Sequence, residues 1–285
     1  GVVLITTKKG KISSYDKPAQ ITFTSSLTSD SKYGSIPLQK KYGQTTPFKE
    51  GVPGSTTSWG AELPAGTPTY AQDDVPFRNA LSAENSLTIS GGSPQFDYLI
   101  NGTYSSIQGY VIGSGLDKTN IRANIGLSLL PGVTMQTNNN YITINNDLPQ
   151  DGSNTSGILL GALRTPPEFN TAQYLYADGT QRRFASYDNP LWTQHFNTFN
   201  SNIARFIHGT DLRIRFFDWL TFNTRIGFDR YEYINKSRLA VGSAGSANRA
   251  GEIGNSRITN EKMNLDFTAT LQDRFMDDQL QMNFI

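Results

Sequence analysis

Cysteine is absent from the 285 residues of the sequence, and histidine occurs only twice, at His195 and His208. Without cysteine there is no disulfide scaffold, no thiolate zinc site and no cysteine nucleophile. The two histidines are too isolated for the usual ligand spacing of a zinc site. A Gly-x-Ser-x-Gly nucleophile elbow and a phosphate-binding P-loop are also missing. We therefore expect a protein that is not an enzyme and that uses no metal and no cofactor.

An excess of charge of either sign is missing as well, because 25 Lys and Arg residues face 24 Asp and Glu residues. A nucleic-acid-binding protein usually shows a clustered basic face, and none is visible, so we expect no nucleic-acid partner. No apolar run approaches the ~20 residues of a membrane-spanning helix, since the longest extends only from Ile158 to Leu163. The mean hydropathy of −0.43 suits a water-soluble protein. It equally suits a barrel whose strands show lipid on one face and water on the other.

The pattern that is present is the period of two that is typical of β-strands. Four segments alternate apolar and polar residues in this way: 96–104, 121–129, 220–228 and 263–271. In the second segment, apolar residues occupy every odd position from Ile121 to Leu129, and Arg122 and Asn124 are among the residues between them. Because an amphipathic helix does not give this pattern, we expect an all-β, antiparallel fold.

The connections between these segments alternate between short and long. Tight hairpin turns are expected at residues 91–94, 131–132, 217–218 and 277–278. Longer polar connections are expected at about residues 30–83, 107–118, 146–200 and 233–260. Short turns at one end and long loops at the other are the layout of an outer-membrane barrel. About nine strands follow the first segment, an open number for barrels that normally have an even count.

The length of the apolar stretches agrees with this layout. Bulky residues bracket the apolar face from Phe96 to Tyr104 and from Leu220 to Phe228. Eight residues at about 3.3 Å each cover roughly 26 Å, which a tilt of about 40° shortens to roughly 20 Å, near the ~25 Å apolar band of such barrels. A soluble β-sandwich or propeller also alternates, but the long loops on one side and the polar rows favour a transmembrane β-barrel.

Several segments resemble the SusC/RagA family of TonB-dependent outer-membrane transporters, and they occur in the family's order. Residues 152–167, GSNTSGILLGALRTPP, are the most specific of them. The others are residues 1–10 (GVVLITTKKG), 85–92 followed by 96–98, 108–114 followed by 118–124, and 188–193 (DNPLWT).

The resemblance implies a fragment of a plugged barrel of the ~22-strand class, with long extracellular loops. Residues 1–10 resemble the last strand of the plug domain, and residues 11–285 the N-terminal part of the barrel. It further implies TonB-dependent import across the bacterial outer membrane of an oligosaccharide or glycan, or of a peptide. The implied partners are outer-membrane lipid, a SusD-like surface lipoprotein that closes over the barrel, and a TonB complex that acts through parts absent from this chain. Two alternatives stay open: a soluble β-sandwich carbohydrate-binding module, and a surface receptor or adhesin barrel that imports nothing.

Two groups of residues are candidates for functional sites. Rings that stack on sugar faces, beside groups that bond hydroxyls, predict a cargo site in the long loop formed by Tyr174, Tyr176, Tyr187, Asp188, Asn189 and Trp192. The alternative is that these residues pack against one another and rigidify the loop. Facing the lumen we expect Arg122, Asn124, Asn223 and Arg225. A short helix over residues 154–163 is also expected, capped by Ser153 or Asn154 and ended by Pro166-Pro167.

Overall fold

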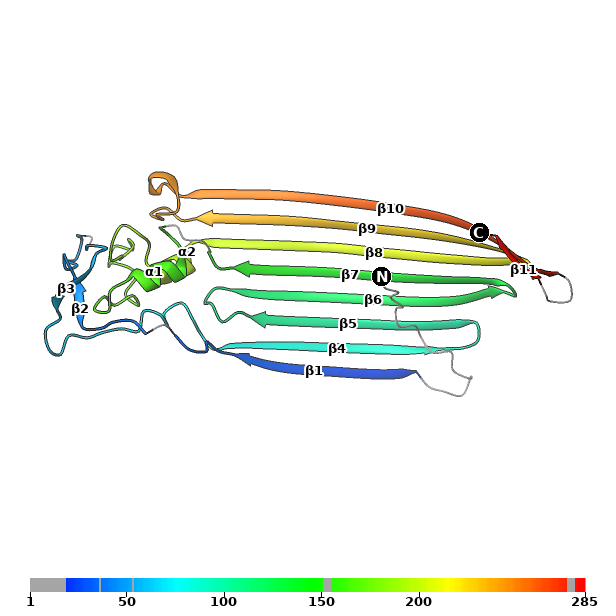
Figure 1. Ribbon diagram of the computed structural model, residues 1–285, viewed down its shortest axis with the longest axis horizontal. Coiled ribbons are helices and arrows are strands. Elements are labelled where there is room, and N and C mark those ends of the chain that lie inside the picture. Colours follow the sequence, from blue (N-terminus) through cyan, green and yellow to red (C-terminus); the bar gives the residue numbers. More distant parts are fainter. Residues whose placement is uncertain (1–18, 36, 53, 151–154, 276–279, 285) are drawn as a thin grey trace.

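A single antiparallel sheet dominates the computed structural model, which describes residues 19–35, 37–52, 54–150, 155–275 and 280–284 (Figure 1). Within these residues nine strands pair in the order β1-β4-β5-β6-β7-β8-β9-β10-β11. They are β1 (Gln20–Asp30), β4 (Ala80–Gly92), β5 (Phe96–Gln108), β6 (Gly115–Leu130), β7 (Val133–Leu148), β8 (Thr198–Phe217), β9 (Leu220–Leu239), β10 (Glu252–Phe275) and β11 (Leu280–Phe284). The sheet is an open part of a barrel, which confirms the predicted fold class.

The short connections lie where the turn residues predicted them. Residues 93–95 join β4 to β5, residues 131–132 join β6 to β7, and residues 218–219 join β8 to β9. Gly132 has a φ of 84°, a left-handed conformation that favours glycine in a two-residue turn. The expected turn at 277–278 and the expected plug strand at residues 1–10 lie outside the described residues.

Two of the long loops are shorter than expected. The connection from β5 to β6 is limited to residues 109–114, and the one from β9 to β10 to residues 240–251. The strands continue through residues that are polar on both faces, such as Asn235-Lys236-Ser237, which pair residue by residue with β10. Backbone hydrogen bonds between strands do not require alternating apolar residues, so a strand can extend beyond the segment in which its sequence alternates.

The strand register sorts side chains onto two chemically different faces. One row across the sheet consists of Phe96, Leu127, Met135, Leu212, Thr224 and Phe267. The neighbouring row, one residue further along each strand, consists of Asp97, Gly126, Gln136, Asp211, Arg225 and Asp266. Because successive residues of a strand point to opposite faces, one face is apolar and the other is polar.

The apolar face has the height that a bilayer requires. On β9 it begins at Leu220 and reaches Arg230, whose row also contains Ile121, Tyr141 and Phe206. Ten residues at about 3.3 Å each and a tilt of about 40° give roughly 25 Å, the height of the apolar band of an outer-membrane barrel. Beyond this row the same face becomes polar.

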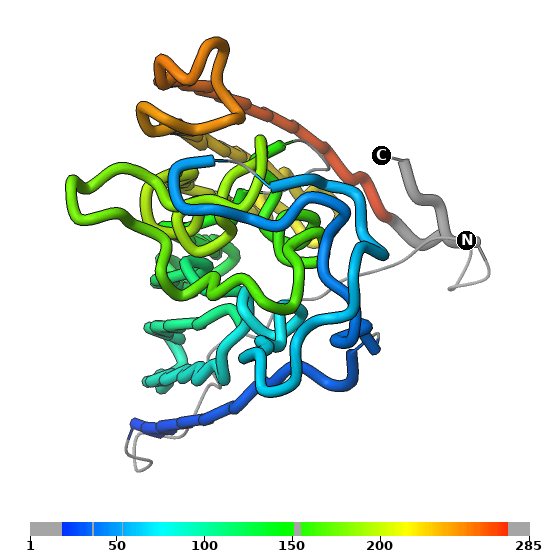
Figure 2. Tube along the Cα trace, turned by 90° about the vertical axis from the view of Figure 1, so that its left-hand side faces the viewer, coloured from blue at the N-terminus to red at the C-terminus, as the bar shows by residue number. Residues whose placement is uncertain are grey.

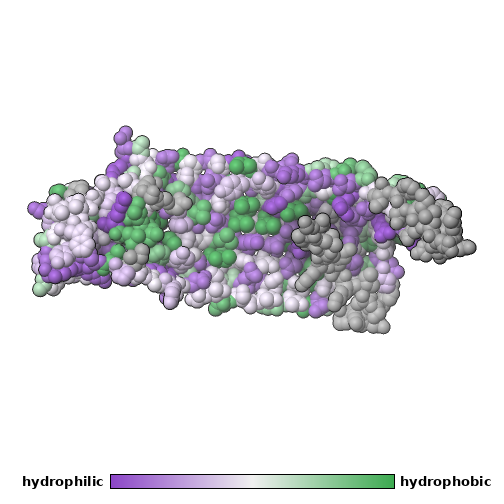
Figure 3. All heavy atoms as spheres, in the orientation of Figure 1, coloured by the Kyte–Doolittle hydropathy of each residue, from purple (hydrophilic) through white to green (hydrophobic). Residues whose placement is uncertain are grey.

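The sheet curves into an open arc, and the loops at one end lie mostly on its inner side (Figure 2). The strand residues Ser105, Asn124 and Ser201, all on the polar face, are buried. Side chains on the inner side of an arc are crowded, so the polar face is the concave one. Figure 3 views this side, where polar and intermediate residues prevail over the strands with hydrophobic ones scattered among them.

The loop end contains a small sheet and two helices. Strands β2 (Tyr42–Gln44) and β3 (Ser58–Glu62) pair within the loop between β1 and β4. Helix α1 (Ile158–Arg164) follows Gly157 as its N-cap and ends before Pro166-Pro167; the expected caps Ser153 and Asn154 lie outside the described residues. Helix α2 (Pro190–Phe196) was not expected. No helix among the described residues is long and apolar enough to cross a membrane.

Candidate functional site

The loop end of the sheet collects the segments with the most varied chemistry. Antiparallel pairing returns the chain to the same end after every two strands, so residues 31–79, 109–114, 149–197 and 240–251 all emerge there. Their small apolar core consists of Phe169, Phe184, Ala185 and Tyr187, with Phe48 packed against it. This core joins the loop that precedes β4 to the loop that precedes β8.

Arg182 strengthens the same junction. Its guanidinium donates three hydrogen bonds to the two carboxylate oxygens of Glu50, with Nη2 2.8 Å from Oε1, and lies 4.4 Å from the centre of the Phe169 ring. Its Nη1 also donates to the backbone carbonyl of Asn170 at 3.1 Å. The hydrogen bond from Arg182 lowers the pKa of Glu50. Arg182 therefore links the two long loops through an ion pair with Glu50, a cation–π contact with Phe169 and a hydrogen bond to the backbone of Asn170.

A second junction attaches the loop between β9 and β10. Asp188 is buried, and its carboxylate accepts hydrogen bonds from the backbone N–H of Ala244 at 2.8 Å and from Ser243 Oγ at 2.9 Å. Ser243 Oγ in turn accepts a hydrogen bond from Asn197 Nδ2 at 3.0 Å. Burial raises the pKa of Asp188, against the lowering effect of the Ala244 and Ser243 hydrogen bonds. The carboxylate thus fastens residues 240–251 to the rest of the loop end.

Four of the six residues proposed for cargo binding have packing partners inside the loops. Tyr187 is buried and donates a hydrogen bond from its hydroxyl to the carbonyl of Arg164, and Asp188 forms the junction just described. Asn189 caps α2 by accepting from the N–H of Leu191, and its amide nitrogen donates to two loop carbonyls. Trp192 is buried and stacks on Phe196. The packing alternative accounts for these four side chains.

The other two residues of that set are half-buried, and each contacts a different part of the loops. Tyr174 stacks on His195 with ring centres 4.9 Å apart. The Tyr176 hydroxyl accepts a hydrogen bond from the backbone N–H of Gly51 at 3.2 Å. All six side chains therefore make contacts within the loops, and Tyr187 alone among them belongs to the small apolar core.

The four residues expected in the lumen share the concave face in four successive rows. Asn223 and Arg225 are followed on β9 by Gly227 and Asp229, whose rows contain Asn124 and Arg122. Arg225 forms an ion pair with Asp211 at 3.2 Å. Two rows further on, Asp229 binds Arg205 through two hydrogen bonds of 2.9 and 2.6 Å. Paired charges and amides along these rows make a surface that suits water or a polar protein segment.

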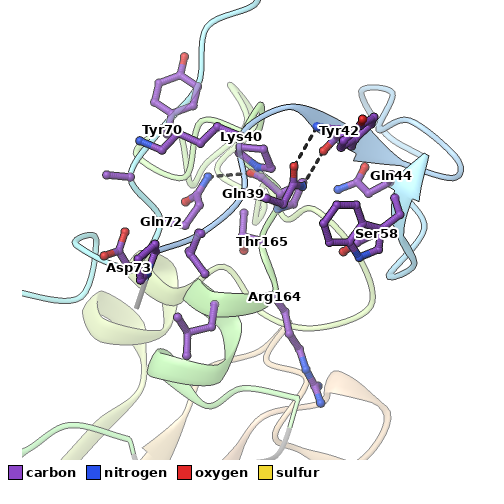
Figure 4. Close-up of a pocket in the computed structure, with 18 of the residues that line it drawn as sticks. Gln39, Lys40, Tyr42, Gln44, Ser58, Tyr70, Gln72, Asp73, Arg164 and Thr165 are labelled. Atoms are coloured by element: carbon purple, nitrogen blue, oxygen red, sulfur yellow. Dashed lines mark hydrogen bonds between the residues drawn. The ribbon is translucent and has the colours of Figure 1, made fainter. Parts of the chain in front are cut away.

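A pocket lies at the far end of the loops, between β2–β3, residues 70–74 and the end of α1 (Figure 4). Its volume is about 570 Å³, and Gln44, Trp59, Tyr70 and Arg164 are among its lining residues. The sequence offered one signal for it, a group of aromatic residues in the polar loop 30–83. The sequence does not show that β2 pairs with β3, so it could not predict that Tyr42 and Trp59 lie close together.

Comparisons with known proteins agree with this fold. No protein-family model and no curated protein matches the chain. Among solved structures, the RagAB peptide importer in its "open-open" state has a TM-score of 0.69 at 16% identity, and in its "closed-closed" state 0.67 at 15%. A further structure of the RagAB peptide transporter gives 0.67 at 14%. Each match covers 95% of this chain and 34% of that chain. The chain thus has the fold of about a third of a RagAB chain.

Proposed function

We propose that the chain is the early barrel part of a SusC/RagA-type importer in the bacterial outer membrane, with residues 1–10 as the end of its plug and residues 11–285 as barrel. The observation that carries the proposal is the apolar band on the convex face of one open sheet, backed by a polar concave face. Such a band is stable against lipid, and the polar rows behind it suit a filled lumen.

The soluble β-sandwich has less support. A sandwich buries the apolar faces of two sheets against each other. Here Phe267 of β10 is 73% exposed, Met263 is 69% exposed and Ile121 of β6 is 50% exposed, and in the described residues no second sheet covers them. Lipid accounts for this exposure without a further layer.

Import would use the loop end as the entrance for cargo, with a SusD-like surface lipoprotein above it and a TonB complex acting from the inner side. The fold likeness to RagAB, a peptide importer, supports this role. The cargo is a glycan or a peptide. A surface receptor or adhesin of the same fold is the second candidate. Loss of an importer impairs growth on its cargo, whereas loss of a receptor or adhesin impairs surface attachment.

Cell fractionation tests the location. An antibody against the exposed segment 172–180 should detect a heat-modifiable band heavier than 31.5 kDa in the outer membrane of cells that make the native protein. A band in the soluble fraction would overturn the proposal.

Gene deletion tests the activity. Deletion should abolish growth on either an oligosaccharide mixture or a peptide digest as sole carbon source, and so should loss of TonB. If growth on both is unchanged while surface attachment is lost, the receptor alternative replaces import.

A further inference from the structure

Above the apolar band, the convex face of β9 and β10 is basic. The two strands run side by side toward the loop end (Figure 1), and every second residue of each points outward. Four cations are outward and exposed in this part of the sheet: Arg230, Lys236 and Arg238 of β9, and Arg257 of β10. They form a stripe that begins at the upper edge of the apolar band and continues toward the loops.

Two cations of the stripe have acidic partners on the same face. Arg230 forms an ion pair with Glu261 at 3.1 Å, and Arg257 forms one with Glu232 at 2.8 Å. These pairs cross from one strand to the other between exposed side chains, so they balance charge locally.

The other two cations, nearer the loops, have no such balance. Lys236 makes no ion pair and no hydrogen bond with the described residues. Arg238 donates from Nη2 to the backbone carbonyl of Phe196 at 3.1 Å, which leaves its charge uncompensated. The upper part of the stripe therefore has a net positive charge and free donors.

The same rows on the neighbouring strands contain no cation. From β5 to β8 their outward residues are Tyr104, Thr119, Thr143 and Ala204, then Ser106, Asp117, Asn145 and Asn202, then Gln108, Gly115, Asp147 and Asn200. The only charges among them are the two aspartates. Positive charge above the band is thus confined to β9 and β10, and this segregation indicates a negatively charged partner at that place.

The stripe is taller than the headgroup layer of a phospholipid. Arg238 lies eight residues beyond Arg230, which at about 3.3 Å per residue and a tilt of about 40° places it roughly 20 Å above the apolar band. Phospholipid headgroups add only about 5–7 Å on each side of the hydrocarbon core. The free cations therefore lie above phospholipid phosphates, at a height where only a lipid with a thick, charged headgroup offers anions.

We infer that this stripe binds lipopolysaccharide, the phosphorylated glycolipid of the outer leaflet. Its phosphates and acidic sugars would lie along the cations from Arg230 to Arg238, because Lys and Arg form strong charge-assisted hydrogen bonds with such groups. Its acyl chains would lie against the band below, where Phe228 and Met263 form the next outward row and Met263 is 69% exposed. The inference rests on the proposed function, since it requires the loop end to lie outside the cell.

The full-length protein, purified from the outer membrane and freed of bound lipid in detergent, tests the site. The probes are fluorescently labelled lipopolysaccharide and, separately, labelled phosphatidylglycerol, which carries one phosphate on a thin headgroup. Titrations compare the wild type with the double variant Lys236→Gln and Arg238→Gln. The matched control is the double variant Lys118→Gln and Lys262→Gln, which removes the same charge from the concave face.

We expect the Lys236 and Arg238 double variant to bind lipopolysaccharide about 25-fold more weakly than the wild type, because each basic residue near an anionic lipid surface contributes about a factor of five. The control should bind like the wild type. Wild-type binding by the first double variant, or an equal loss in the control, would overturn the site. Equally tight binding of phosphatidylglycerol would overturn the choice of lipid.

The two proposals fail in different ways. A protein that resides in the outer membrane but binds no lipopolysaccharide would overturn this inference alone. Absence from the outer membrane in cell fractionation would instead overturn the proposed function.

Discussion

Asp188, just before α2, holds the backbone N–H of Ala244 between its two carboxylate oxygens, at 2.9 and 2.8 Å. These residues are 56 positions apart in the sequence and belong to different loops. The carboxylate is almost fully buried, so the contact excludes water. Together with the hydrogen bonds from Asn197 to Ser243 and from Thr155 to Ala244, it attaches residues 240–251 to the rest of the loop end.

Replacing Asp188 with alanine should release that loop. The substitution leaves the N–H of Ala244 and the hydroxyl of Ser243 without their acceptor, a loss of about 1–3 kcal/mol of local stability. Hydrogen exchange should therefore accelerate in peptides covering residues 240–251. Asp178→Ala is the control, because Asp178 bonds only within its own exposed turn, to Thr180. Equal exchange in the two variants would contradict the fastening role.

The same contact should depend on pH. Burial raises the pKa of Asp188 above its ordinary 3.8, so the attached loop binds the proton more tightly than the released loop does. Attachment is therefore strongest below the ordinary pKa and weakens as pH rises through the raised value. Intrinsic-rate-corrected hydrogen exchange of residues 240–251 should be slower at about pH 4 than at about pH 8. Asp188→Asn should remove this difference, and greater protection at high pH in the wild type would refute it.

The strands could be predicted from the sequence, whereas the loop sites could not. Alternation places Leu265 and Asn264 on opposite faces because strand geometry alone fixes the side-chain direction. Asp188 and Trp192 look like cargo ligands in the sequence, but their burial depends on loops far away along the chain. Helix α2 had a readable signal that was missed: Asn189 is a preferred N-cap, and Pro190 suits the first helical position. The contact between Tyr42 and Trp59 follows only from how β2 pairs with β3.

Placing a charge on the convex face should impair membrane assembly. Leu265 lies mid-band, in the row of Ile125 and Ile226. Leu265→Lys should therefore cost about 2–4 kcal/mol when the full-length barrel folds into lipid vesicles. Asn264→Lys is the matched control, because the neighbouring residue points to the concave face and should cost little. Equal unfolding free energies for the two variants, measured by denaturant titration, would show that the faces are wrongly assigned.

The last prediction concerns the close contact between β2 and β3 at Gly60. An alanine Cβ at Gly60 would lie 1.9 Å from the carbonyl oxygen and 2.8 Å from the backbone nitrogen of the residues facing it, Gln44 and Thr45, so β2 and β3 must separate. Backbone atoms cannot rotate away as a side chain can, and overpacking of this kind costs about 1–3 kcal/mol.

Gly60→Ala should therefore accelerate hydrogen exchange across residues 41–63 while the nine-stranded sheet keeps its protection, because the small sheet forms no strand pairs with the large one. Gly102→Ala is the control, since a Cβ there meets nothing within 4 Å. Wild-type exchange in Gly60→Ala would mean that the two strands are not in contact, and the placement of the Trp59 ring against Tyr42 would then be wrong as well.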